Sequence, residues 1–108
     1  MAQAKTACLE KIRKFVERAR EEISVEEVYL FGSHISGKIY PDSDIDIAVI
    51  SKSFEGIEPF ERLVWLGKIA WKAGTPEVEA LGYTPEEFQK ANPWDFSSEI
   101  RKSGESVL

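Results

Sequence analysis

Two aspartates one residue apart, Asp44 and Asp46, have the clearest capacity for chemistry in this sequence. They begin an apolar run, and alternate side chains of a strand share a face, so both carboxylates point the same way. Ile45 and Ile47 then share the other face and can enter a core. A turn could account for Asp44 but not for Asp46, because a charge inside an apolar strand must be paired or metal-bound. Oxygen ligands at this spacing suit Mg²⁺, which combines one or two carboxylates with substrate phosphates.

A second apolar run ends at Gly32 and Ser33, upstream of the aspartates. Backbone N–H groups and a hydroxyl at such a turn can hold the phosphates of a nucleotide. Gly-Ser alone is an ordinary helix N-terminus, but beside the aspartates the phosphate-binding interpretation is favoured. Ser43 either orients Asp44 or caps the turn, and the sequence leaves both roles open.

Gly32-Ser33, followed after a gap by Ser43-Asp44-Ile45-Asp46, resembles the signature of the DNA polymerase beta-like nucleotidyltransferases. The small size of the chain points to the minimal nucleotidyltransferase (MNT) branch, which includes MNT antitoxins. The resemblance implies an α/β fold with a mixed β-sheet flanked by helices. Alignment with the third-strand motif of the family places a third carboxylate at Glu79, where relatives usually carry aspartate. Glu77 is better interpreted as a charge on an exposed strand face.

The activity that this resemblance implies is transfer of a nucleoside monophosphate, with AMP favoured, from a nucleoside triphosphate to an acceptor hydroxyl. Two Mg²⁺ ions would be held by Asp44, Asp46 and Glu79, and the nucleotide, with ATP favoured, by Gly32, Ser33 and Ser43. The family also implies a separately encoded helical partner of the HEPN type in a toxin–antitoxin system. A homodimer remains open. The competing interpretation is a binding module that neutralises its partner by contact. Two departures from the family pattern favour it: Glu79 replaces an aspartate, and His34 stands where many relatives carry arginine.

The overall composition limits the classes of function. The length predicts one domain over residues 1–108. A net charge of −5 argues against nucleic acid as a partner, because phosphate neutralisation needs a clustered basic surface. No apolar segment is long enough to span a membrane. The single cysteine, Cys8, fits a reducing compartment, so we expect a cytoplasmic protein.

The elements that must position the site follow from periodicity and turn chemistry. Helices are predicted over 5–23, over 59–73 with a broad apolar stripe, from Pro85 to Asn92, and over 94–102; a short helical segment is predicted over 33–37, and a tail over 104–108. Strands are predicted over 25–31, 44–50 and 77–83, with a loop over 51–56. The connection between the first two strands is too short for a crossover helix, so we expect them to run antiparallel in a mixed sheet. Three tryptophans are interpreted as core or interface residues, with Trp94 the best of them for a partner surface.

Overall fold

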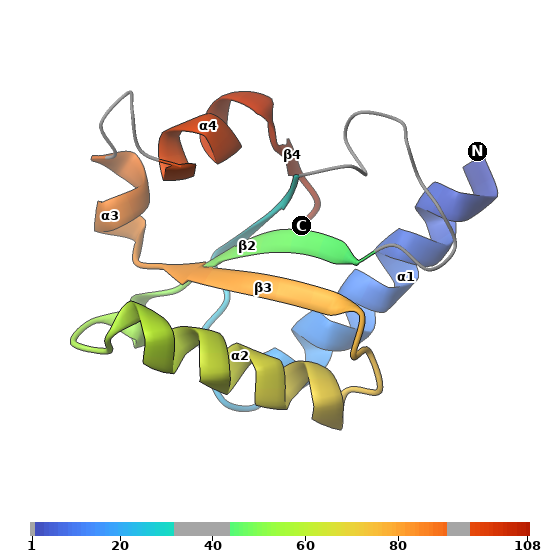
Figure 1. The fold of residues 1–108 in the computed structure, drawn as a ribbon, viewed down its shortest axis with the longest axis horizontal. Helices are drawn as coiled ribbons and strands as arrows, with labels where there is room; N and C mark the ends of the chain where they lie inside the picture. The colour runs from blue at the N-terminus through green and yellow to red at the C-terminus, as the bar shows by residue number, and fades with distance from the viewer. Residues whose placement is uncertain (1, 32–43, 91–95) are drawn as a thin grey trace.

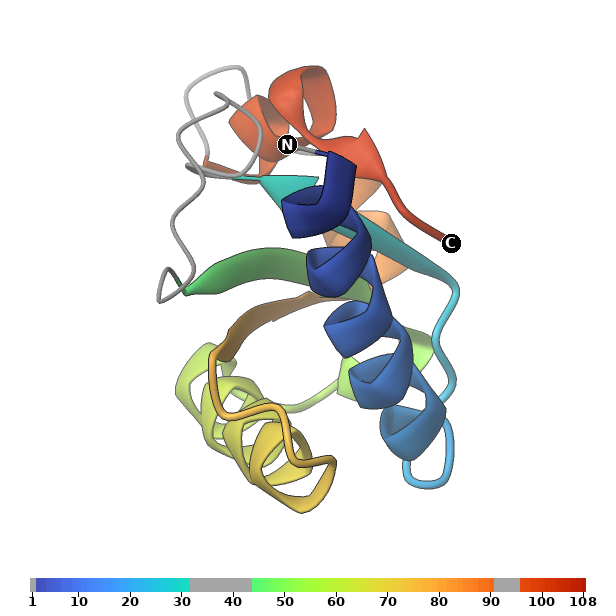
Figure 2. The ribbon, with the colours of Figure 1, turned by 90° about the vertical axis from the view of Figure 1, so that its right-hand side faces the viewer.

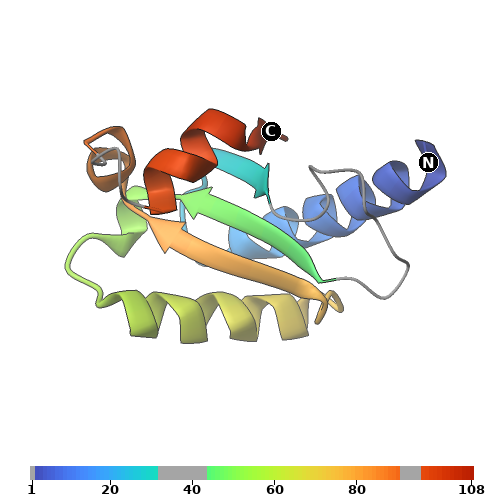
Figure 3. The ribbon, with the colours of Figure 1, turned by 45° about the horizontal axis from the view of Figure 1, so that its top comes forward.

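A four-stranded sheet lies between two layers of helices in the computed structural model, which describes residues 2–31, 44–90 and 96–108 (Figures 1 and 3). The elements are α1 (Ala2–Ala19), β1 (Glu27–Phe31), β2 (Ile45–Ile50), the short 3₁₀ helix η2 (Lys52–Phe54), α2 (Pro59–Lys72), β3 (Val78–Tyr83), α3 (Pro85–Gln89), α4 (Phe96–Ser103) and β4 (Glu105–Ser106). Within these described ranges, no helix is long and apolar enough to cross a membrane.

The sheet has the strand order β3-β2-β1-β4 and is mixed. β1 runs antiparallel to β2 and to β4, whereas β2 and β3 are parallel. The parallel pair is possible because α2 carries the chain back between β2 and β3, as a parallel connection requires. The predicted mixed sheet with antiparallel first strands is therefore confirmed.

Both faces of the central strand β2 are buried, which explains its nearly continuous apolar run. Ile45, Ile47 and Val49 face the larger core cluster, which α1 and α2 cover (Figures 1 and 2). Ala48 and Ile50 face a smaller cluster on the other side, beside α3 and α4. The predicted division of this strand into a core face and an acidic face therefore holds at its start, whereas its later residues are buried on both faces.

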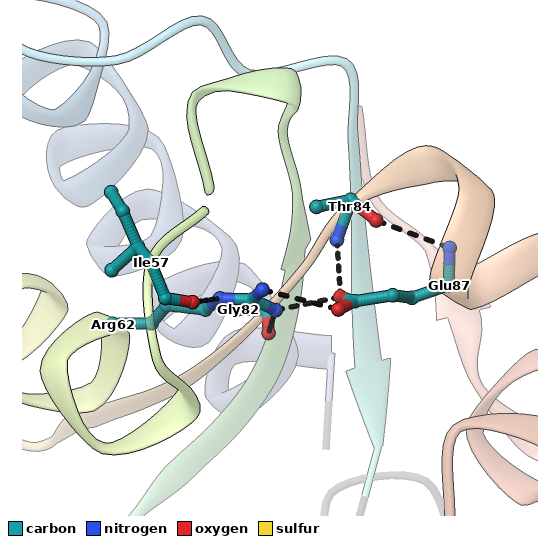
Figure 4. A network of polar contacts seen from close by, with 5 residues as sticks. All are labelled: Ile57, Arg62, Gly82, Thr84 and Glu87. Atoms are coloured by element: carbon teal, nitrogen blue, oxygen red, sulfur yellow. Dashed lines mark hydrogen bonds and ion pairs between the residues drawn. The ribbon is translucent and has the colours of Figure 1, made fainter. Parts of the chain in front are cut away.

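A buried arginine joins α2 to β3 and α3 (Figure 4). The Arg62 guanidinium donates to the carbonyls of Ile57 at 2.7 Å and Gly82 at 3.2 Å, and to both carboxylate oxygens of Glu87 at 2.6 and 3.1 Å. Glu87 also accepts from the backbone N–H of Thr84, whose hydroxyl accepts from the Glu87 N–H. This reciprocal pair is a capping box, and it begins α3 at Pro85, where the sequence predicted a helix to start.

Several predicted boundaries in the first half of the chain were wrong. The first helix ends at Ala19 instead of residue 23, although a following turn still buries Ile23 through its N–H bond to the Ala19 carbonyl. β1 starts at Glu27 instead of residue 25, and the predicted loop over 51–56 contains η2, which the Ser51 hydroxyl caps. The predicted helical segment over 33–37 lies outside the described residues.

The second half needs corrections of the same kind. β3 begins at Val78 instead of residue 77, α3 ends at Gln89 before Asn92, and the last helix extends to Ser103. The predicted tail over 104–108 was wrong, because β4 pairs with β1 and the Val107 N–H donates to the Val28 carbonyl at 3.0 Å.

The apolar residues of α2 divide between a buried face and an exposed face of the helix. Ile69 and Ala70 are buried, whereas the other large members of the stripe are exposed: Phe60, Leu63, Val64 and Trp71. The core-facing side of α2 includes buried Arg62, so part of the surface that the apolar pattern predicted to face the core is occupied by a charged residue.

Candidate active site

The sheet register holds Asp46 between two neighbouring strands. Its Cα partner on β1 is Phe31, the residue before Gly32 in the sequence, and its partner on β3 is Glu79. In parallel strands, residues in register point to the same face of the sheet. Asp46 and Glu79 are therefore neighbours on one face, and Asp44 precedes them at the start of β2.

The three carboxylates interact with one another. Loss of solvation raises the pKa of Glu79, and the charges of Asp44 and Asp46 and hydrogen bonds with both raise it further. Asp46 is half-buried, whereas Asp44 and Glu79 are exposed. Carboxylates this close repel one another when all are ionised, so a proton or a cation is needed to stabilise the group.

Glu77 has different surroundings from Glu79. It precedes β3, and its carboxylate lies 3.3 Å from the ammonium group of Lys11 on α1. Its carbonyl accepts a 2.8 Å hydrogen bond from the N–H of Ile45, which aligns the starts of β2 and β3. The structure thus gives Glu77 a structural partner and places Glu79 among the acidic residues.

The donor chemistry of the acidic group fits a divalent cation. Carboxylate oxygens are the ligands that Mg²⁺ prefers, and a cation would relieve the repulsion that raises the pKa of Glu79. Among the described residues, no group of three or more acidic, histidine or cysteine side chains is already arranged as a complete metal-ligand set. Exposed Asp44 and Glu79 therefore have to turn toward a bound ion, which their exposure permits.

A groove of about 930 Å³ leads to these carboxylates along the open edge of β3. Its polar lining consists of Asp46, Glu79 and Glu99, and no lysine or arginine belongs to this described lining. Its other lining residues are Phe31, Leu63, Gly67, Ala70, Pro76, Val78, Ala80, Leu81 and Ile100. Glu99, in the first turn of α4, was missed by the sequence analysis because no motif marks it. The groove is acidic and apolar and its described lining has no basic side chain, which disfavours a nucleic acid as its occupant.

The predicted phosphate-binding residues Gly32, Ser33 and Ser43 lie outside the described residues, as do His34 and Trp94. Their roles stay predictions. Of the other two tryptophans, Trp65 donates from its indole N–H to Glu22 at 3.0 Å, and Trp71 is exposed.

Comparisons with known proteins identify the family and the fold. The family model described as a nucleotidyltransferase domain matches residues 9–106. A candidate nucleotidyltransferase from Sulfolobus solfataricus has a similar structure, with 22% identity, a TM-score of 0.67, and coverage of 97% of this chain and 83% of its own.

Two further solved structures share the fold. A toxin–antitoxin complex with AMP-PNP has 23% identity and a TM-score of 0.61, and covers 89% of this chain and 71% of its own. A mutant of the MntA–HpeT toxin–antitoxin pair has 20% identity and a TM-score of 0.59, with coverage of 89% and 70%. A search of curated proteins gives no match.

Proposed function

Because the chain belongs to the nucleotidyltransferase domain family, we propose that it transfers a nucleoside monophosphate from a nucleoside triphosphate to an acceptor hydroxyl. The observation that carries this proposal is the parallel register that sets Glu79 beside Asp46, with Asp44 interacting with the same group. ATP is the favoured donor, since one structure of the same fold contains AMP-PNP.

Asp44, Asp46 and Glu79 would hold the metal ions of this reaction. When bound, two Mg²⁺ ions supply charge neutralisation for the triphosphate and for the acceptor oxygen. Strand pairing on both sides fixes the backbone of Asp46, which sets the face and the edge of the sheet at which its carboxylate is offered to the metal. Binding of the triphosphate is assigned to Gly32, Ser33 and Ser43 on sequence grounds. Positioning and charge neutralisation suffice, and no covalent intermediate with the protein is needed.

The acceptor is proposed to belong to a helical partner protein of the HEPN type, with this chain acting as the antitoxin. The support is that two structures of the same fold are toxin–antitoxin assemblies, one of them studied with two aspartates, two positions apart, replaced by glutamate. The groove, lined by apolar residues and carboxylates, suits a protein surface better than a nucleic acid. The second candidate is neutralisation by contact alone, which the longer side chain of Glu79 in place of aspartate favours.

Intact-mass measurement of a partner that co-purifies with the tagged chain separates the two candidates. With Mg²⁺ and ATP, the enzyme predicts a mass increase of the partner equal to one AMP. The Asp46→Asn chain should give no increase, and the control Glu77→Gln, which alters the carboxylate paired with Lys11, should behave as the wild type. A stable complex whose mass never changes would reject catalysis and favour the binding module.

A further inference from the structure

The outer face of α2 carries a continuous row of exposed apolar side chains. Phe60 and Trp71 are 73% and 76% exposed, and Leu63 and Val64 lie between them at 46% and 42%. With Gly67, these residues recur every three or four positions and form one face of the helix. We name this face the α2 stripe. It lies opposite the core-facing residues Arg62, Leu66 and Ile69. Monomers rarely leave such rows uncovered, so the α2 stripe indicates a docking surface.

Gly67 lies at the middle of the α2 stripe, where glycine weakens a helix. A Cβ at this position would meet nothing within 4 Å, so no contact inside the described chain requires a glycine there. The close approach of another helix does give a reason, because a missing side chain leaves a hollow into which a neighbouring side chain can fit.

From these features we infer that the α2 stripe pairs with the α2 stripe of a second copy of this chain, with the two helices antiparallel. The midpoint between Phe60 and Trp71 is also the midpoint between Val64 and Gly67. A two-fold axis at this point sets Phe60 against Trp71 of the second copy and Val64 over its Gly67. Large residues then meet as aromatic pairs, and a branched side chain enters the glycine hollow.

The charges beside the stripe are complementary under the same symmetry. Glu61 and Lys68 are seven residues apart, so they lie on one flank of α2 within about 20° of each other. A two-fold axis brings this flank against its own copy in reverse order. Glu61 then lies about 3 Å, the rise of two residues, along the axis from Lys68 of the second copy. Among the described residues, neither of these two side chains has an ion pair or hydrogen bond. Lys72, farther around the helix, is 3.6 Å from Glu22.

The size of the surface sets the expected strength. α2 has 14 residues and is about 21 Å long, so one helix pair buries less than a typical stable interface. We therefore expect a concentration-dependent dimer with a dissociation constant on the order of 10 µM or weaker. Leu63 and Gly67 also line the groove that contains Asp46 and Glu79. The second copy would then stand at the rim of the candidate active site, but the contact itself does not depend on catalysis.

Sedimentation equilibrium of the purified chain tests the inference. The wild type should shift toward twice the 12.2 kDa mass of one chain as its concentration rises. Glu61→Lys should raise the dissociation constant about three- to tenfold at low salt, because two attractive pairs per dimer become repulsive. Lys68→Glu should do the same, and the double variant Glu61→Lys/Lys68→Glu should restore wild-type association.

The matched control is Glu10→Lys, the same charge reversal at an exposed position of α1, which should leave association unchanged. Helical circular dichroism checks folding, since lysine and glutamate have similar helix propensities. A chain that stays monomeric up to about 1 mM overturns the inference. A dimer that the single charge reversals weaken, but that the double variant does not restore, also overturns the inference. An α2 stripe that binds only a different helical protein, and not a second copy of this chain, overturns it as well.

Discussion

Replacing Glu87 with glutamine is expected to lower the free energy of unfolding by about 1.5–2 kcal/mol at neutral pH. The Arg62 side chain is only 7% exposed, and two of its hydrogen bonds go to the Glu87 carboxylate at 2.6 and 3.1 Å. Breaking a fully buried ion pair costs about 3–5 kcal/mol, but the Glu87 side chain is 46% exposed, so water replaces part of the loss. Glutamine keeps an oxygen that can accept from the Thr84 N–H, which isolates the effect on Arg62.

The pH dependence of this loss has a definite sign. Hydrogen bonds from Arg62, followed by the backbone of Thr84, hold the pKa of Glu87 below its usual value near 4.5. Its stabilising contribution is therefore present above that value and is lost as the pH falls through the lowered pKa. Denaturant unfolding from pH 7 downward should show a difference between wild type and Glu87→Gln that is largest at pH 7 and shrinks as the pH falls below 4.5. A difference below about 0.5 kcal/mol at pH 7, or one that does not change with pH, would refute the reasoning.

Three other changes test different parts of the structure. Asp46→Asn should reduce nucleotidyl transfer at least about 100-fold without lowering the thermal midpoint, because one member of a repulsive group loses its charge; transfer at the wild-type rate would contradict the assignment. Without metal, Glu79 contributes stability below its ordinary pKa, and this contribution is lost as the pH rises through its raised pKa. The thermal midpoint of Glu79→Gln should therefore exceed that of the wild type at pH 7 but not at pH 4. Addition of Mg²⁺ should remove the difference at pH 7. Gly82→Ala should lower the free energy of unfolding by about 1–3 kcal/mol, since a Cβ there would lie 2.8 Å from the ring of buried Phe54. Adding Phe54→Leu to the same chain should recover part of the lost stability in a thermal melt.

Local patterns predicted the central part of the fold. The strand containing Asp46 was recognisable because its apolar residues are buried on both faces. The predicted helix start at Pro85 was correct, and the Thr84 capping box stabilises it there. Long-range contacts were not recognisable from local patterns. β4 is formed by two polar residues that pair with the open edge of β1, and no local pattern marks such a pairing. The exposed position of Phe60 and Trp71 follows from how α2 is rotated on the sheet, which its broad apolar stripe did not determine.

The sequence predicted part of the candidate site but not all of it. Asp44 and Asp46 stand out by type and spacing, whereas Glu79 was assigned only through a family resemblance. The structure brings Glu79 to Asp46 through the β2–β3 register, and a register depends on the packing of the whole sheet. Glu99 reaches the same groove from α4, 20 residues after Glu79 and 53 after Asp46 in the sequence, so only the folded chain reveals it.

The central claim is that the acidic group on β2 and β3 binds metal together with a nucleotide. The most direct test is a calorimetric titration of a non-hydrolysable ATP analogue, with and without Mn²⁺, into the wild type, Asp46→Asn and the Glu77→Gln control. We expect metal-dependent binding by the wild type and the control, and at least a tenfold loss of affinity in Asp46→Asn, about 1.4 kcal/mol. Equal binding by wild type and Asp46→Asn, or no metal-dependent binding by the wild type, would contradict the account.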